Sequence, residues 1–172
     1  MDADSILIRR MRGGDEAAIE TFVRKHYPAV MHYCYIRTSD VHQAEDLAQE
    51  TFYRFFRSFS DYSHKGRLAN FLYVIAGNLC RDYRRLAQRS QAAELTEEAA
   101  GAAPDPGYVQ AMDIHGAILG LPEEIRDVIR MHFFLGMTLR EIAAAEGIGL
   151  PLVKYRLRRG KELLRGALGK EE

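Results

Sequence analysis

The stretch MTLREIAAAEGIGLPLVKYRLRRGKELLR, residues 137–165, contains the signals of two helices joined by a tight turn. Thr138 is followed three residues later by Glu141, which is the spacing of a capping box at a helix start. The glycines of GIGL at 147–150 favour a turn, and Pro151 suits the start of the next helix because its missing N–H needs no partner there. The pattern predicts a helix-turn-helix.

The second of these helices is strongly basic. Residues 152–165 hold six basic side chains and one acidic one, although the whole chain balances 24 basic against 24 acidic side chains. In a helix-turn-helix the second helix lies in the DNA major groove, where cations meet phosphates and base edges. A solvated charged face would also explain the charge alone, but the capping box and the glycine turn favour DNA binding.

The remainder of the chain also has helical periodicity. It contains no alternating β-branched runs and no Asn-Gly hairpin signal, so we expect an all-α fold. Asp15 and either Ser39 or Asp40 are candidate N-caps, and Pro28 is expected to begin a helix of its own. The other expected helices lie within residues 4–12, 38–62, 68–90, 114–120 and 121–136.

The middle of the chain has a different composition. Residues 91–115 carry five acidic side chains and no basic one, and GAAPDPG at 101–107 is a cluster of turn residues. Such a segment buries too little apolar surface to fold alone. We therefore expect two small helical domains, residues 1–90 and 113–172, joined by a flexible acidic linker at 91–112 and holding no fixed relative orientation.

Several classes of protein are disfavoured by composition. No apolar run reaches the roughly 18 residues of a membrane span, and the acidic start does not resemble a signal peptide, so a cytoplasmic protein is expected. Cys34 and Cys80 do not make a disulfide framework, and the six histidines are scattered without metal-ligand spacing. We expect no metal site and no cofactor.

Two segments, taken together, resemble one family. AEDLAQETFYRFF at 44–56 and LANFLYVIAGNLCRDYRR at 68–85 are similar to region 2 of bacterial extracytoplasmic-function (ECF) sigma factors, and residues 121–165 are similar to their region 4. The resemblance covers nearly the whole chain outside 86–110. It implies a transcription initiation factor rather than an enzyme, with region 2 opening the −10 promoter element and region 4 reading the −35 element as duplex.

The resemblance also implies partners and sites. Core RNA polymerase would be contacted at its clamp and flap, and an anti-sigma factor, often membrane-anchored, would hold the protein inactive without the chain itself inserting in a membrane. Residues implied for clamp binding are Asp46, Gln49 and Glu50, which fall on one polar stripe of their helix with Tyr53. Residues implied for −10 DNA binding are Tyr62, His64, Lys65, Arg67, Asn78, Arg81, Arg84 and Arg85.

Two of the region 2 positions have simpler alternative roles. Asn78 would lie near the flipped-out −10 base, but an Asn in an apolar helix also bonds local backbone groups. Phe71 stands where many relatives have Trp, and it is equally explained as a core aromatic.

Residues implied for −35 DNA binding are Lys154, Tyr155, Arg156, Arg158 and Arg159. Relatives usually have small or hydroxyl residues where this chain has Pro151, Leu152 and Tyr155. We therefore predict an altered −35 preference, to be tested by reselecting sites with Tyr155→Ser.

Two other classes of function compete with a sigma factor. A stand-alone regulator would use the same helix-turn-helix to bind duplex operators as a dimer, but it has no use for the 44–56 motif. A recombinase-like enzyme needs a nucleophile with converging arginines or a carboxylate cluster. Asp46 and Glu50 share a helix face, and no further carboxylates clearly converge on them.

Overall fold

The computed structural model describes residues 3–64, 67–94 and 114–169, and within these ranges the chain is helical without a strand, as expected. The expected linker lies outside the described residues except for 91–94, which continue the fourth helix. The elements are α1 (Ala3–Arg12), α2 (Glu16–Thr38), α3 (Val41–Arg57), the 3-10 turn η1 (Phe59–Asp61), α4 (Leu68–Glu94), α5 (Ile114–Leu119), α6 (Glu123–Phe133), α7 (Leu139–Glu146) and α8 (Leu150–Leu168).

The helix starts follow the capping signals of the sequence. Asp15 Oδ1 accepts from the backbone N–H of Ala18 at 3.2 Å, and Asp40 Oδ1 accepts from that of His42 at 2.8 Å. At the start of α7 the capping box is complete: Thr138 Oγ1 accepts from the Glu141 N–H at 3.2 Å, and the Glu141 carboxylate accepts from the Thr138 N–H at 2.7 Å.

The prediction that Pro28 begins a separate helix is wrong. Pro28 lies inside α2, which runs without a break from Glu16 to Thr38. A proline inside a helix loses one backbone hydrogen bond. Phe22 on one side of it and Val30 on the other are both fully buried in one core, so tertiary packing holds the helix continuous.

The N-terminal half, α1–α4, is built around aromatic side chains. Phe22 and Phe55 stack with their ring centroids 4.9 Å apart, which joins α2 to α3. Phe55 also contacts Phe71 of α4 edge-on at 6.0 Å. Aromatic pairs of this kind bury large apolar areas and fix the relative position of their helices.

The C-terminal half, α5–α8, contains the predicted helix-turn-helix. Gly147 ends α7 with φ = 64°, a left-handed conformation that glycine adopts without strain, and α8 begins three residues later. The inner side of α8 packs closely on α6, because a Cβ on Gly160 would lie 2.7 Å from Ile129. Glycine therefore sets both the turn and the close approach of the helix behind it.

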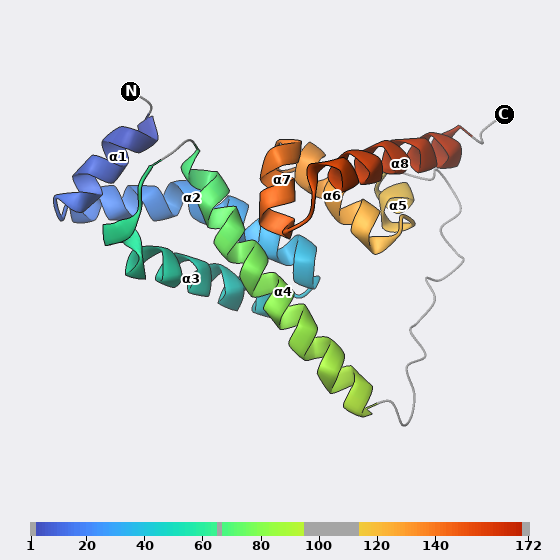
Figure 1. The fold of residues 1–172 in the computed structure, drawn as a ribbon, viewed down its shortest axis with the longest axis horizontal. Helices are drawn as coiled ribbons and strands as arrows, with labels where there is room; N and C mark the ends of the chain where they lie inside the picture. The colour runs from blue at the N-terminus through green and yellow to red at the C-terminus, as the bar shows by residue number, and fades with distance from the viewer. Residues whose placement is uncertain (1–2, 65–66, 95–113, 170–172) are drawn as a thin grey trace.

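The two halves pack against each other, in contrast to the expectation that they hold no fixed orientation. Figure 1 shows α7 beside the first part of α4, while the last turns of α4 extend away from the other helices. A Cβ on Gly77 of α4 would overlap the carbonyl oxygen of Ala145 in α7. Periodicity predicts which helix faces are apolar, but it does not predict that a glycine lets these two backbones touch.

Candidate nucleic-acid interface

The polar stripe of α3 lies on the surface. Asp46 and Gln49 are exposed, and the half-buried Glu50 accepts from Arg54 Nε at 2.8 Å one turn further on. Tyr53 is also exposed and lies under the Arg57 guanidinium at 5.8 Å. The stripe therefore presents carboxylates and amides to solvent on a helix whose opposite side is buried.

The loop between α3 and α4 is attached to the aromatic core. Tyr62 is 9% exposed and packs against Phe71 with ring centroids 4.9 Å apart. Its hydroxyl is 3.0 Å from His64 Nδ1, and its carbonyl accepts from Arg12 of α1. Tyr62 thus anchors the loop from inside. Phe71 is half-buried and packs against the same core, and Lys65 lies outside the described residues.

Asn78 lies on an exposed face of α4. Its Oδ1 accepts a hydrogen bond from the Arg81 side chain one turn later. Arg85 is exposed as well and lies 3.7 Å from Asp82 of the same helix. Both side chains reach the solvent.

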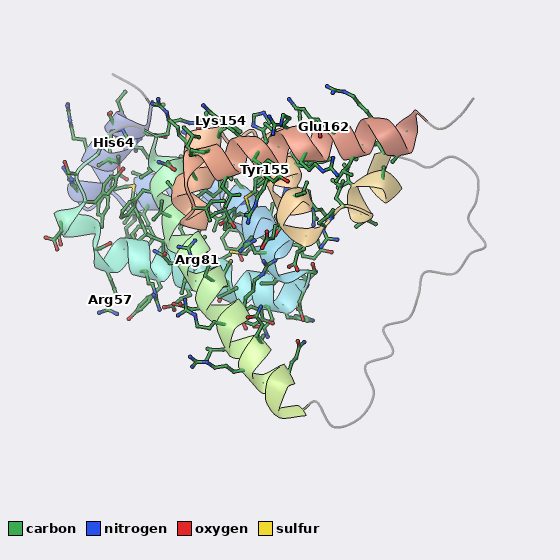
Figure 2. All side chains as sticks on the ribbon, turned by 45° about the vertical axis from the view of Figure 1, so that its right-hand side comes forward. Arg57, His64, Arg81, Lys154, Tyr155 and Glu162 are labelled. Atoms are coloured by element: carbon green, nitrogen blue, oxygen red, sulfur yellow. The ribbon has the colours of Figure 1, made fainter. Side chains whose placement is uncertain are left out.

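The remaining cations of this face are bound by the C-terminal half. Arg67, just before α4, pairs with Glu141 of α7 at 3.1 Å. Arg81 donates to the Ala145 carbonyl at the last turn of α7, the negative end of that helix; Figure 2 labels Arg81 on α4, close to α7. Arg84 reaches the carboxylates of α6 and is described next.

A buried charged cluster lies where α2, α4 and α6 meet. Arg84 pairs with Glu123 at 2.7 Å and with Asp127 at 3.2 Å. Arg37 of α2 pairs with the same Asp127 at 2.7 Å and with Glu146 of α7 at 3.1 Å.

Burial governs the ionisation of this cluster. Desolvation raises the pKa of Asp127, although Arg37 and Arg84 act in the opposite direction. Burial also raises the pKa of Tyr33 well above its usual value, and its hydroxyl donates to Glu146 at 2.6 Å.

Reasoning from the sequence missed this cluster. Asp127 lies one turn before the fully buried Met131, and a charged residue at such a core-facing helical position is a signal of a buried ion pair. The same signal applies to Arg37, which lies one turn after the fully buried Tyr33. The partner of each charge comes from the other half of the chain, and its identity has no local signature.

The outer face of α8 carries the predicted duplex-reading residues. Lys154, Tyr155, Arg158 and Arg159 are exposed, and Figure 2 shows the first two on α8. The Arg158 guanidinium lies 5.8 Å from the Tyr155 ring, a cation–π arrangement. Arg156 differs from these residues because it is half-buried and pairs with Glu124 of α6 at 2.7 Å.

In the described part of the chain, no helix is both long and apolar enough to cross a bilayer. The same part also contains no group of three or more His, Cys, Asp or Glu side chains arranged to hold a metal ion.

Comparison with known proteins identifies both halves. The family model for Sigma-70 region 2 matches residues 22–90, and that for Sigma-70, region 4 matches residues 111–164. The chain is 33% identical over 168 residues to the ECF RNA polymerase sigma factor SigE of Mycolicibacterium smegmatis, covering 91% of this chain and 65% of SigE. It is 30% identical over 169 residues to the RNA polymerase sigma factor CarQ of Myxococcus xanthus, covering 96% of this chain and 97% of CarQ.

A solved structure shows the same fold. The sigma factor RpoE in its complex with the anti-sigma factor NepR from Bartonella quintana aligns with a TM-score of 0.64 and 19% identity, covering 90% of this chain and 98% of that one. At this identity the match concerns the helical architecture alone. The two region models and the relatives of nearly full length show that this chain belongs to the ECF sigma factors of the sigma-70 family.

Proposed function

We propose that this chain is an alternative sigma factor that binds core RNA polymerase and directs promoter-specific transcription initiation in the cytoplasm. Residues 1–90 act as region 2, residues 113–172 act as region 4, and residues 91–112 link them. One observation carries the proposal: this member of the family has both a basic recognition helix, α8, whose charged side faces outward, and an exposed polar stripe on α3.

Region 4 reads the −35 element through α8. Lys154, Arg158 and Arg159 project from one solvent-facing side of this helix, while Val153 and Leu157 fix its other side in the core. An arginine that contacts guanine O6 and N7 gives about 1–3 kcal/mol of discrimination. We expect Arg156, which pairs with Glu124, to meet a phosphate rather than a base.

Region 2 opens the −10 element on α4 and the preceding loop. Extruding a base costs a few kcal/mol of stacking, which a base pocket and a basic channel for the phosphates can offset. Asn78 supplies the polar group for the base. Residues that line the channel are His64, Lys65, Arg67, Arg81, Arg84 and Arg85, while Tyr62 supports the loop.

The protein contacts of this factor follow from its family. Asp46, Gln49 and Glu50 bind the polymerase clamp, and the C-terminal half reaches the flap. The fold neighbour RpoE was solved with an anti-sigma factor. We expect this chain, too, to be held by such a partner, which is membrane-anchored in many families of this type.

Run-off transcription tests the proposal. Purified chain and bacterial core polymerase are supplied with a fragment library of the source genome, and discrete new transcripts are expected. Asp46→Ala combined with Glu50→Ala should abolish them, whereas Glu20→Ala, an exposed carboxylate on α2, should not. Specific duplex binding with no transcripts would indicate a stand-alone regulator instead.

A further inference from the structure

The last residue of α1, Arg12, contacts the segment that follows α3. Its side chain donates a hydrogen bond to the backbone carbonyl of Tyr62, 50 residues further along the chain. The same guanidinium lies 5.9 Å from the centroid of the Phe59 ring, a cation–π arrangement. Phe59 begins the 3-10 turn η1 and Tyr62 follows its last residue, so one side chain contacts the turn at both ends.

The turn η1 has few bonds of its own. It is three residues long, and among the described residues no side chain caps its start. Its backbone bonds run from the Asp61 N–H to the Ser58 carbonyl at 3.1 Å and from the Tyr62 N–H to the Phe59 carbonyl at 3.2 Å. Because 3-10 hydrogen bonds have poor geometry, contacts from outside such a turn contribute strongly to its conformation.

Helix α1 is a firm base for this contact. Ile8 and Met11 are 3% and 4% exposed, and Met11 directly precedes Arg12. Near the other end of the helix, Asp4 pairs with Lys25 of α2 at 2.5 Å. Figure 1 shows α1 beside the segment that follows α3. The backbone that carries Arg12 is therefore held against the same core as the loop.

The contact is close to a residue proposed to bind −10 DNA. The Tyr62 ring is buried against Phe71, and its hydroxyl lies 3.0 Å from His64 Nδ1. His64 is two residues beyond the carbonyl that Arg12 holds. Fixing the backbone at Tyr62 thus fixes the point from which the chain continues to His64.

We infer that Arg12 is a positioning residue for −10 recognition, which holds the loop beginning at Tyr62 in the conformation that binds the extruded base. The inference rests on the proposed function, because it takes this loop to be part of the −10 surface. It gives a role in promoter choice to α1, a helix that precedes residues 22–90, the part matched by the region 2 family model.

Amide hydrogen exchange tests the holding of the turn. Arg12→Met removes the donor and the charge and keeps an unbranched side chain, so the amides of Asp61 and Tyr62 should exchange about tenfold faster, as expected for the loss of one hydrogen bond to a charged group. Arg24→Met is the matched control, because Arg24 is an exposed arginine of α2 whose partner, Glu20, is on the same helix. The control should exchange like the unmodified chain.

Promoter choice is measured with the holoenzyme. The chain and core polymerase transcribe a library in which the −10 positions are randomised and each template carries a downstream barcode. Molecules with a displaced loop do not contact the base, so Arg12→Met should reduce discrimination at the position read by the loop by up to about tenfold, the factor by which the turn is loosened. Arg12→Lys, which keeps a cation and a donor, should restore most of it.

Unchanged exchange at η1, or an unchanged −10 preference in a folded Arg12→Met chain, would overturn the inference. Uniformly weaker transcription from every template, with normal exchange, would also overturn it, because that pattern is typical of a direct phosphate contact.

The unmodified chain separates this inference from the sigma function. If it yields no transcripts with core polymerase, both fail; if it is active and only the preference of Arg12→Met is unchanged, the role of Arg12 alone fails. If circular dichroism shows Arg12→Met to be unfolded, Arg12→Gln replaces it, and the same two readouts apply.

Discussion

The two DNA-facing surfaces of this protein, on α8 and on α4, have similar arginine content and opposite environments. On α8 the Arg158 side chain is 71% exposed and its carboxylate neighbour, Glu162, belongs to the same helix. On α4 the Arg84 side chain is 26% exposed and its carboxylates come from the other half of the chain. Basic residues in a sequence therefore indicate a nucleic-acid surface, but not whether that surface is accessible.

The largest expected effect is a loss of stability when the charged contacts of the α4 surface are removed. Asp127→Ala leaves Arg37 and Arg84 without their shared partner, and removing one member of a buried pair costs about 3–5 kcal/mol. Glu124→Ala removes an exposed partner of Arg156 and should cost about 0–1 kcal/mol. Urea unfolding of both variants measures this difference in the free energy of unfolding. If both variants lose the same free energy, the buried cluster contributes no more to stability than an exposed ion pair.

On the α8 surface, Arg158→Ala removes one of the residues proposed to contact the −35 duplex. Loss of one major-groove contact should weaken binding of the free chain to a −35 duplex by about 1–3 kcal/mol and relax specificity at the contacted base pair. Arg84→Ala should leave duplex binding unchanged, because Arg84 is committed to the contact between the halves. A duplex titration in which the two variants weaken binding equally would contradict the comparison.

A smaller change at α8 sharpens the comparison by testing sequence preference. Tyr155→Ser removes the ring beneath the Arg158 guanidinium, a contact of about 0.5–1 kcal/mol at an exposed site. The freed arginine and the new hydroxyl should select a different −35 sequence. Site selection from a randomised duplex pool measures this, and an identical consensus for both proteins would rule the idea out.

Much of the fold could be predicted because its signals are local. The caps at Asp15, Asp40 and Thr138, and the turn at Gly147, depend on residues within one helical turn of each other. Pro28 misled because tertiary packing outweighed a local preference for helix starts.

The candidate site divides in the same way. The exposure of α8 and of the α3 stripe follows from helical period, since both have a buried opposite side. The packing of α7 on α4 could not be predicted from the sequence. It depends on Gly77 fitting against Ala145, and these two residues are far apart in the chain and of types that give no sign of the contact. The inward position of Tyr62 is likewise decided by Phe55 and Phe71, its neighbours in space.

The smallest expected effect is a pH dependence of stability caused by His26. Burial lowers the pKa of His26 in the N-terminal half, despite Asp4 nearby and with a minor contribution from Lys25. A lowered folded-state pKa means that the unfolded chain binds more protons, so the stability due to neutral His26 is present above about pH 6.5 and is lost as pH falls.

Urea unfolding at neutral and mildly acidic pH measures the effect. Replacing His26 by Phe, which suits its contact with Phe22 at 5.1 Å, should remove part of the acid sensitivity. His42→Gln, at an exposed site, is the control and should retain it. Identical pH dependence in all three proteins would assign the acid sensitivity to other groups.

The missing side chain at position 77 also has a genetic consequence. Every glycine codon is a single base change away from an alanine codon, and such a change adds the carbon atom that α7 cannot accommodate. A single mutational step can therefore disturb the packing of α4 on α7 without altering any residue assigned to promoter or polymerase.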